Sequence, residues 1–263
     1  MVLFRGDIKC KSLQRRTSLS VILPADNIHY LQGTEEIVEK PYKTLYLLHG
    51  LFGSDDIFLA NTTIQKFAED HNIAVVLPSG ENSFYVDQKE SHKYYGEFIG
   101  RELVEMTRNI FPLSHKKEDT YLAGFSMGGY GAIRNGLKYH DNFGYIGAIS
   151  AALLTDDLHN WGEGDDLLSS KSFAQSCFGD LNKVIGSDMD PKFLIDDLIA
   201  NDIEIPKIFM AVGDNDFLYN ENIDYYNYLK SRNVDVEFRC SSGEHTWEFC
   251  NDYIKEFIEW LPL

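Results

Sequence analysis

Residues 121–131 read YLAGFSMGGYG, and this stretch decides how the rest of the chain is interpreted. Its first three residues are apolar, as in a short buried strand, and a helical pattern follows from Tyr130 to about Tyr139. Between the two, Gly124-Phe125-Ser126-Met127-Gly128 has the spacing of a nucleophile elbow, in which a serine occupies a sharp turn from strand to helix. The flanking glycines allow strand and helix to approach closely. Such a turn presents the serine hydroxyl at a helix N-terminus, where developing negative charge is stabilised.

Short apolar runs alternate with amphipathic stretches on both sides of this motif. Most runs are apolar on both faces, as expected for strands of a parallel sheet covered by helices; they are residues 45–48, 73–77, 121–123, 145–149, 208–212 and 234–238. Helical patterns lie between them, at about residues 57–68, 95–111, 130–139, 223–229 and 247–261. This alternation predicts an α/β protein with a doubly wound, mostly parallel sheet and, with the elbow, the α/β-hydrolase fold.

Two segments depart from this rhythm. The first forty residues are predicted to contain an antiparallel hairpin, because apolar residues recur from Leu3 to Leu13 and again from Leu19 to Leu23, with turn-prone residues between. Residues 151–206 are acidic and loop-like, and we interpret them as an insertion that covers the active site at the carboxyl edge of the sheet. With this insertion included, residues 1–263 are predicted to form a single domain.

Composition restricts the class of partner. The chain is 44% hydrophobic and 25% charged, with 41 acidic and 24 basic residues and a net charge of −17. Such a charge repels nucleic acid and anionic membranes, so we expect a small-molecule substrate and neither of those partners; a homo-oligomer stays open. The four cysteines show no metal-ligand spacing and are interpreted as reduced thiols. Without a membrane-spanning apolar run or a signal-peptide pattern, a cytoplasmic protein is expected.

The order of residues along the chain selects partners for Ser126. In α/β-hydrolases the nucleophile is followed by a carboxylate and then by a histidine. His245 is the only histidine after the predicted strand at residues 208–212, which makes it the candidate base. The carboxylate belongs just after that strand, where Asp214 and Asp216 compete. We favour Asp216, which leaves room for the chain to round the strand end, and interpret Asp214 as a turn former.

An ester carbonyl attacked by serine becomes an oxyanion, which two backbone amides should receive. One candidate is the amide of Met127, directly after the nucleophile. The other is the amide of Leu51 in the segment His49-Gly50-Leu51-Phe52-Gly53, which follows an early strand. His49 precedes the serine and is expected to brace this loop. Together these residues predict a serine carboxylesterase that works through an acyl-enzyme intermediate.

The chain resembles the bacterial tributyrin-esterase branch of the esterase D family, which includes S-formylglutathione hydrolases, feruloyl and acetyl-xylan esterases and mycolyl transferases. The motifs that carry the resemblance are residues 47–50, 123–131, 213–219 and 243–247. The resemblance implies a triad of Ser126, Asp216 and His245, oxyanion amides at Leu51 and Met127, and short acyl chains on a simple alcohol. It also implies that no cofactor or metal takes part.

Some positions depart from the family pattern and bear on the substrate. No cysteine follows the oxyanion glycine, which argues against S-formylglutathione as substrate, and Phe58 stands where tributyrin esterases usually carry tryptophan. Residues 92–95 differ from the glycine-containing stretch usual before the tyrosine pair. Phe52, Tyr95 and Trp247 are candidate substrate contacts.

Several alternatives stay open at this stage. One is an acetyl or feruloyl esterase acting on plant-cell-wall sugar fragments, and another is an S-formylglutathione hydrolase. A peptidase or an acyltransferase could use the same machinery, because the triad does not dictate the acyl acceptor. A non-catalytic binding module on this fold would need a broken triad, whereas the triad predicted here is complete.

Overall fold

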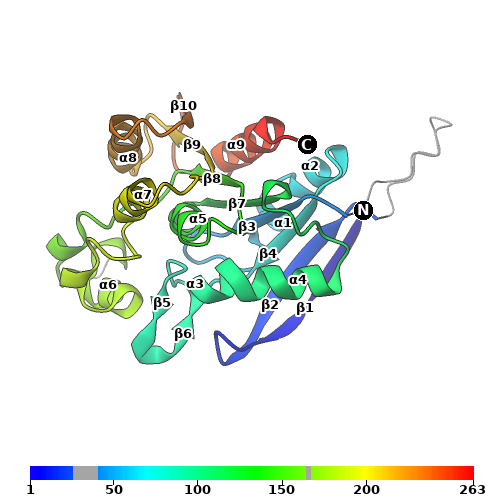
Figure 1. Cartoon of the computed structure of the whole chain (residues 1–263), viewed down its shortest axis with the longest axis horizontal. Coiled ribbons are helices and arrows are strands. Elements are labelled where there is room, and N and C mark those ends of the chain that lie inside the picture. The colour runs from blue at the N-terminus through cyan, green and yellow to red at the C-terminus, as the bar shows by residue number, and fades with distance from the viewer. Residues whose placement is uncertain (26–40, 164–166) are drawn as a thin grey trace.

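The structure of the chain is a computed structural model that describes residues 1–25, 41–163 and 167–263. Its centre is an eight-stranded sheet in the order β1-β2-β4-β3-β7-β8-β9-β10 (Figure 1). The strands are β1 (Val2–Cys10), β2 (Arg15–Leu23), β3 (Thr44–Leu48), β4 (Ala74–Pro78), β7 (Thr120–Phe125), β8 (Tyr145–Ile149), β9 (Lys207–Gly213) and β10 (Val236–Ser241). The predicted runs therefore all become strands, with ends that differ by at most three residues.

The sheet is parallel from β4 to β10 and antiparallel at its other edge. β1 pairs with β2, and β2 with β4, in antiparallel register, so the predicted N-terminal hairpin extends the parallel core. The remainder of the forty residues assigned to that hairpin, 26–40, lies outside the described residues. A second, two-stranded sheet joins β5 (Asp87–Gln88) and β6 (Lys93–Tyr94). The mostly parallel sheet confirms the predicted α/β fold class.

Both faces of the sheet are buried, and each strand contributes to both because its side chains alternate between them. In β3, Leu45 and Leu47 belong to one core, whereas Tyr46 and Leu48 belong to the other. Helices α1 (Ile57–Asn61), α2 (Ile64–Asp70) and α9 (Trp247–Trp260) contribute to the first core, and α4 (Leu103–Ile110), α5 (Met127–Lys138), α7 (Pro191–Ala200) and α8 (Tyr219–Ser231) to the second. Figure 1 shows α2 and α9 together on one side and α4 on the other.

Two predicted helices are broken in the structure. The pattern at residues 57–68 splits into α1 and α2 at Thr62, which is extended (φ −135°, ψ 170°) and donates its hydroxyl to the Phe58 carbonyl. The pattern at residues 95–111 becomes α3 (Tyr95–Glu97), a π-helical turn at Phe98–Glu102 and α4. Periodicity predicts the buried face of such a segment. It does not predict where a side chain, such as that of Thr62, satisfies a helical carbonyl and the helix ends.

The segment from residue 151 to 206 contains α6 (Lys171–Phe178) and α7. Asp190 caps α7 by accepting the Lys192 amide, and Pro191 begins the helix, a position where its missing N–H is harmless. α7 packs on α5 and α8, while α6 packs on β5. The segment therefore flanks the helix that starts after Ser126, and its role as a cover for the active site stays a prediction. Within the described residues, no helix has the length and apolarity to cross a membrane.

Candidate active site

Ser126 occupies the strained turn that its motif predicts. Its backbone has φ +59° and ψ −118°, a region that non-glycine residues rarely adopt and that the surrounding structure must enforce. The turn is held by hydrogen bonds from the Ser126 amide to the Ile149 carbonyl (3.0 Å) and from the Ala152 amide to the Ser126 carbonyl (3.0 Å). The serine thus lies between the end of β7 and the start of α5, at the carboxyl edge of the sheet.

Glycines beside the serine are required by close backbone contacts. A Cβ at Gly124 would lie 2.2 Å from the Gly128 carbonyl oxygen, and a Cβ at Gly128 would lie 2.0 Å from that of Leu48. Both distances are far below van der Waals contact, so the turn and the first helical residues pack directly against the end of β3. The motif is therefore needed for the backbone geometry of the elbow.

This contact predicts a large loss of stability for Gly128→Ala. Alanine is favoured over glycine in helices by about 1 kcal/mol, but here its methyl would overlap backbone that cannot rotate away. We expect the free energy of unfolding in urea to fall by about 3 kcal/mol. Gly6→Ala is the matched control, because a Cβ there meets nothing within 4 Å. Equal effects of the two substitutions would contradict the contact.

His245 and Asp216 form a hydrogen-bonded pair. His245 Nδ1 lies 2.9 Å from Asp216 Oδ2 and 3.1 Å from Oδ1, with the carboxylate fully buried and the imidazole 17% exposed. A carboxylate only accepts, so Nδ1 carries the proton, and in the neutral ring the free lone pair is on Nε2. Burial would raise the pKa of Asp216, but the hydrogen bonds from His245 and from the Leu218 amide (2.8 Å) outweigh it and lower that pKa. Asp216 is thus held as an anion.

The structure separates the two aspartates that the sequence left in competition. Asp214 is exposed and its Oδ1 accepts the Gly243 amide (3.2 Å) and the Asn215 side-chain amide (2.7 Å). It joins the turn after β9 to the loop that carries His245, as expected of a turn former. The geometry brings Asp216, and not Asp214, to the imidazole.

Aromatic rings place the imidazole beside the serine. The His245 ring stacks on Phe125, the residue before Ser126, with centroids 4.5 Å apart and planes at 26°. On the other side it contacts Phe217, with centroids 4.6 Å apart. Among the hydrogen bonds of the described residues, none joins the Ser126 hydroxyl to His245. In unliganded enzymes this bond is often long and tightens when substrate binds.

The predicted oxyanion loop lies against the nucleophile. A Cβ at Gly50 would lie 3.2 Å from Ser126 Cβ and 3.8 Å from its Oγ, so the backbone of Gly50 and Leu51 passes directly beside the hydroxyl. In the described part of the chain, no intramolecular hydrogen bond has the amide of Leu51 or of Met127 as its donor. Both amides are therefore available for an oxyanion.

His49 braces this loop as expected and is not a candidate base. Its Nε2 accepts the Gly80 amide (2.8 Å), so its Nδ1 carries the proton and donates to the Gly50 carbonyl (2.7 Å). Burial lowers the pKa of His49 and keeps the ring neutral. The Tyr85 hydroxyl donates to the His49 carbonyl (2.9 Å), which completes a rigid support behind the loop.

The three candidate substrate contacts have different surroundings. Phe52 is 81% exposed and follows Leu51 directly. Trp247 is half-buried and packs on Phe125 (centroids 5.4 Å apart) and on Phe58 (5.6 Å), close to the imidazole. Tyr95 is fully buried and its hydroxyl accepts from Arg15 (2.9 Å), so its side chain offers no surface to a substrate. The structure therefore argues against Tyr95 and keeps the other two.

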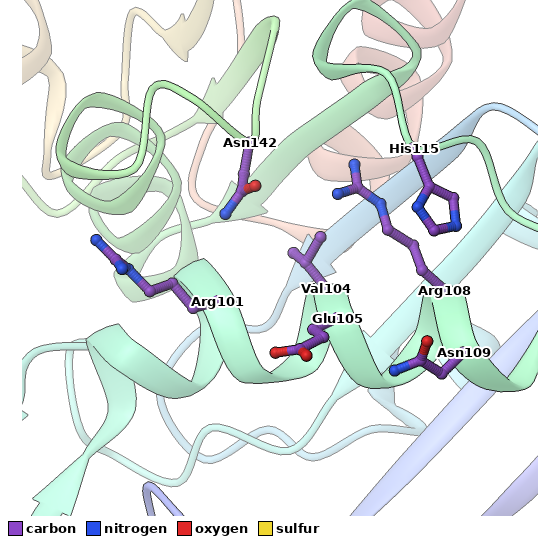
Figure 2. Close-up of a pocket in the computed structure, with 7 residues that line it drawn as sticks. All are labelled: Arg101, Val104, Glu105, Arg108, Asn109, His115 and Asn142. Carbon is purple, nitrogen blue, oxygen red and sulfur yellow. The ribbon is translucent and has the colours of Figure 1, made fainter.

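A groove lined by none of these candidate site residues is drawn in Figure 2. It has a volume of about 300 Å³, and its lining is Arg101, Val104, Glu105, Arg108, Asn109, His115 and Asn142. These residues come from the π-helical turn, from α4 and from the loops before β7 and β8, at the amino edge of the sheet. In residues 1–25, 41–163 and 167–263, no three His, Cys, Asp or Glu side chains are grouped to hold a metal ion.

The sequence did not reveal the residues that hold the candidate triad in place. Phe125 and Phe217 enclose the imidazole, and the Leu218 amide binds the carboxylate. The Ser150 hydroxyl also faces Asp216 and lowers its pKa, although without the geometry of a full hydrogen bond. The only sequence signal for Phe125 and Phe217 is their position next to a candidate triad residue.

Residues 10–259 match the model of the Esterase family. The chain belongs to this family. Over 262 residues it is 41% identical to an acetyl esterase from Caldicellulosiruptor saccharolyticus, with 99% of this chain and 98% of the relative covered. The family resemblance and the predicted activity are thereby confirmed, and this esterase is a carboxylic ester hydrolase.

Solved structures agree with this assignment. A substrate-bound fluorophosphonate-binding serine hydrolase F from Staphylococcus aureus superimposes on this esterase with a TM-score of 0.85 at 32% identity, covering 99% of this chain and 98% of that one. An S-formylglutathione hydrolase apoenzyme from the same organism has a TM-score of 0.83, with the same identity and coverage. These likenesses confirm the α/β-hydrolase fold and the serine-hydrolase class.

Proposed function

We propose that this esterase hydrolyses short-chain acyl esters with Ser126 as nucleophile, His245 as general base and Asp216 as the acid that orients it. The observation that carries the proposal is the hydrogen-bonded Asp216–His245 pair whose ring stacks on the residue before a strained serine. The amides of Leu51 and Met127 form the oxyanion hole. No cofactor or metal takes part in the proposed reaction.

In acylation, the Ser126 oxygen attacks the ester carbonyl while its proton passes to His245 Nε2. The carbonyl oxygen becomes an oxyanion and accepts hydrogen bonds from the two backbone amides. Asp216 stabilises the imidazolium without taking its proton. The tetrahedral intermediate collapses as the alcohol oxygen leaves with the proton from Nε2, and the acyl group stays on Ser126.

In deacylation, water replaces the alcohol. His245 Nε2 takes a proton from the water as its oxygen attacks the acyl carbonyl, and a second oxyanion forms in the same hole. The intermediate then releases the carboxylic acid and returns the proton to the Ser126 oxygen. The same machinery is therefore used twice, which is the basis of ping-pong kinetics.

The surroundings of the triad support a small acyl group. Trp247 packs on both Phe58 and Phe125, so the three rings form an aromatic wall beside the imidazole. The name of the acetyl esterase relative supports acetyl as one such group. We further propose a small-molecule ester as substrate, with no nucleic acid or membrane as partner, and a cytoplasmic location, which the four free cysteines support.

The dependence of activity on the length of the substrate's acyl chain tests this proposal. We expect kcat/KM to be highest for acetyl to butyryl esters and to fall steeply beyond about eight carbons, because each CH₂ contributes about 0.8 kcal/mol only while the pocket encloses it. The measurement is hydrolysis of p-nitrophenyl esters of rising chain length. A maximum at palmitoyl esters, or activity that rises sharply once substrate exceeds its solubility, would show a lipase instead.

The same assay separates the related activities. Feruloyl esters, acetylated xylan fragments and S-formylglutathione are compared with p-nitrophenyl acetate at equal concentration, and Ser126→Ala serves as the blank for each. A kcat/KM for one of these that exceeds the short-ester value by more than about tenfold would reassign the physiological substrate while leaving the site unchanged.

A further inference from the structure

We infer that Asn82 is a positioning residue for the oxyanion hole. Its side-chain oxygen accepts the amide of Phe52 (2.8 Å), the residue directly after the proposed donor Leu51. Asn82 lies 30 residues away along the chain, and nothing in its local sequence points to the active site. The inference rests on the proposed function of the Leu51 amide.

The turn that contains Leu51 is intrinsically unfavourable. The Gly53 amide donates to the Gly50 carbonyl (3.3 Å), so Leu51 and Phe52 are the central residues of a β-turn. Phe52 has φ +63°, whereas Leu51 is outside the positive-φ region, which is the pattern of a type II turn. The second central position of such a turn favours glycine, because a side chain there clashes with the backbone. Phenylalanine needs an external restraint to remain in it.

The side chain of Phe52 does not supply that restraint, since it is 81% exposed. Asn82 does, because the Phe52 amide belongs to the central peptide of the turn. The orientation of this peptide distinguishes a type II turn from a type I turn, in which both central residues have negative φ. Since an amide N–H can only donate, the atom of Asn82 that receives it is the oxygen. The bond therefore holds the central peptide in the type II orientation.

Asn82 is itself fixed from two directions. The buried Cys177 of α6 donates its S–H to the Asn82 carbonyl (3.3 Å), and burial raises the pKa of this thiol to about 12, which keeps the proton on sulfur. Next to Asn82, the Ser83 hydroxyl donates to the Gly80 carbonyl (2.6 Å). Gly80 in turn binds the His49 ring, so residues 80–85 hold both ends of the oxyanion loop.

This arrangement has a specific kinetic consequence. An oxyanion donor acts only if it is already aimed at the position where the charge develops. The Leu51 N–H belongs to the peptide before the central one, so a change of turn type does not itself reverse it. Without the Asn82 anchor, the strain at Phe52 is relieved by rotation about ψ of Leu51 and φ of Phe52, and the Leu51 backbone shifts relative to Ser126. The transition state then loses part of a donor that the ground state does not use. We expect kcat to fall with little change in KM, as for an interaction made only in the transition state.

The experiment is Asn82→Ala assayed on p-nitrophenyl acetate. We expect kcat to fall about 10- to 100-fold, somewhat less than the loss of a whole oxyanion donor, with KM changed by less than about threefold. The concentration of active enzyme is determined by fluorophosphonate titration, so an unfolded fraction does not affect the value of kcat. Asn142→Ala is the matched control: Asn142 is also half-buried and also makes one bond to backbone, to the Gly100 carbonyl (2.7 Å), but lies beside the groove of Figure 2. Its kcat should stay within about twofold of wild type.

A second substitution separates turn control from a general structural role. Glycine adopts positive φ without strain, so with Phe52→Gly the turn no longer depends on its anchor. In that background, Asn82→Ala should lower kcat by less than about threefold relative to Phe52→Gly alone. The inference would be overturned if Asn82→Ala lowered kcat as much in the Phe52→Gly enzyme as in the wild type. It would also be overturned if Asn82→Ala alone left kcat unchanged.

The proposed function and the role of Asn82 are tested separately. Wild-type turnover of p-nitrophenyl acetate that Ser126→Ala abolishes establishes the proposed function before Asn82 is tested. If the wild type lacks that turnover, the proposed function is wrong and the inference falls with it. If the wild type has it and Asn82→Ala matches the Asn142→Ala control, only the role of Asn82 is wrong.

Discussion

Replacing Ser126 with alanine is expected to lower kcat by roughly a million-fold while leaving the fold intact, the scale observed when the nucleophile of a triad is removed. The loss is this large because His245 and Asp216 act only through the serine oxygen. Ser126 makes its backbone hydrogen bonds through its amide and carbonyl, which alanine retains. Turnover of p-nitrophenyl butyrate and a urea unfolding curve measure the two parts of this expectation.

A fluorophosphonate probe provides the independent check. It should label Ser126 alone in the wild type and nothing in Ser126→Ala, with the adduct located by peptide mass spectrometry. Ser231→Ala is a suitable control, because Ser231 is an exposed serine at the end of α8 whose hydroxyl donates a hydrogen bond to the Tyr228 carbonyl (2.7 Å). Labelling of a different serine, or a Ser126→Ala enzyme with a tenth of wild-type activity, would refute the assignment.

Asp216→Asn is expected to have the second largest effect, a fall in kcat of about three to four orders of magnitude. The asparagine amide can donate to His245 Nδ1, which favours the tautomer whose proton is on Nε2 and removes the lone pair that should accept the serine proton. The imidazolium also loses the buried anion that stabilises it. Steady-state kinetics on a short ester measures the loss, and KM should change far less than kcat.

Asp214→Asn is the matched control, two positions earlier in the same turn. An asparagine oxygen can still accept the Gly243 amide, and the position is exposed, so we expect kcat within about threefold of wild type. If Asp214→Asn were the more damaging of the two, Asp214 would be the orienting acid. The hydrogen bonds of Asp216 to His245 would then have no catalytic meaning.

Local sequence could predict those parts of the fold that depend on the burial pattern of neighbouring residues. The strands on both sides of Ser126 were recognisable because a covered parallel strand must be apolar on both faces. The break at Thr62 and the π-helical turn after Tyr95 were not, because they depend on satisfying particular helical carbonyls in the folded state. Tyr95 shows the same limit: an aromatic residue is equally suited to a core and to a binding site, and burial decides between them.

The sequence by itself determined the kind of site. The elbow needs glycines on both sides of a serine, and the order of serine, aspartate and histidine leaves His245 as the only candidate base, so both could be predicted without coordinates. Only the tertiary structure decided between Asp214 and Asp216, and only it brought Asn82 to Phe52. The physical reason is that chain neighbours determine backbone conformation, whereas contacts across 29 or 30 residues depend on which loops meet at the edge of the sheet.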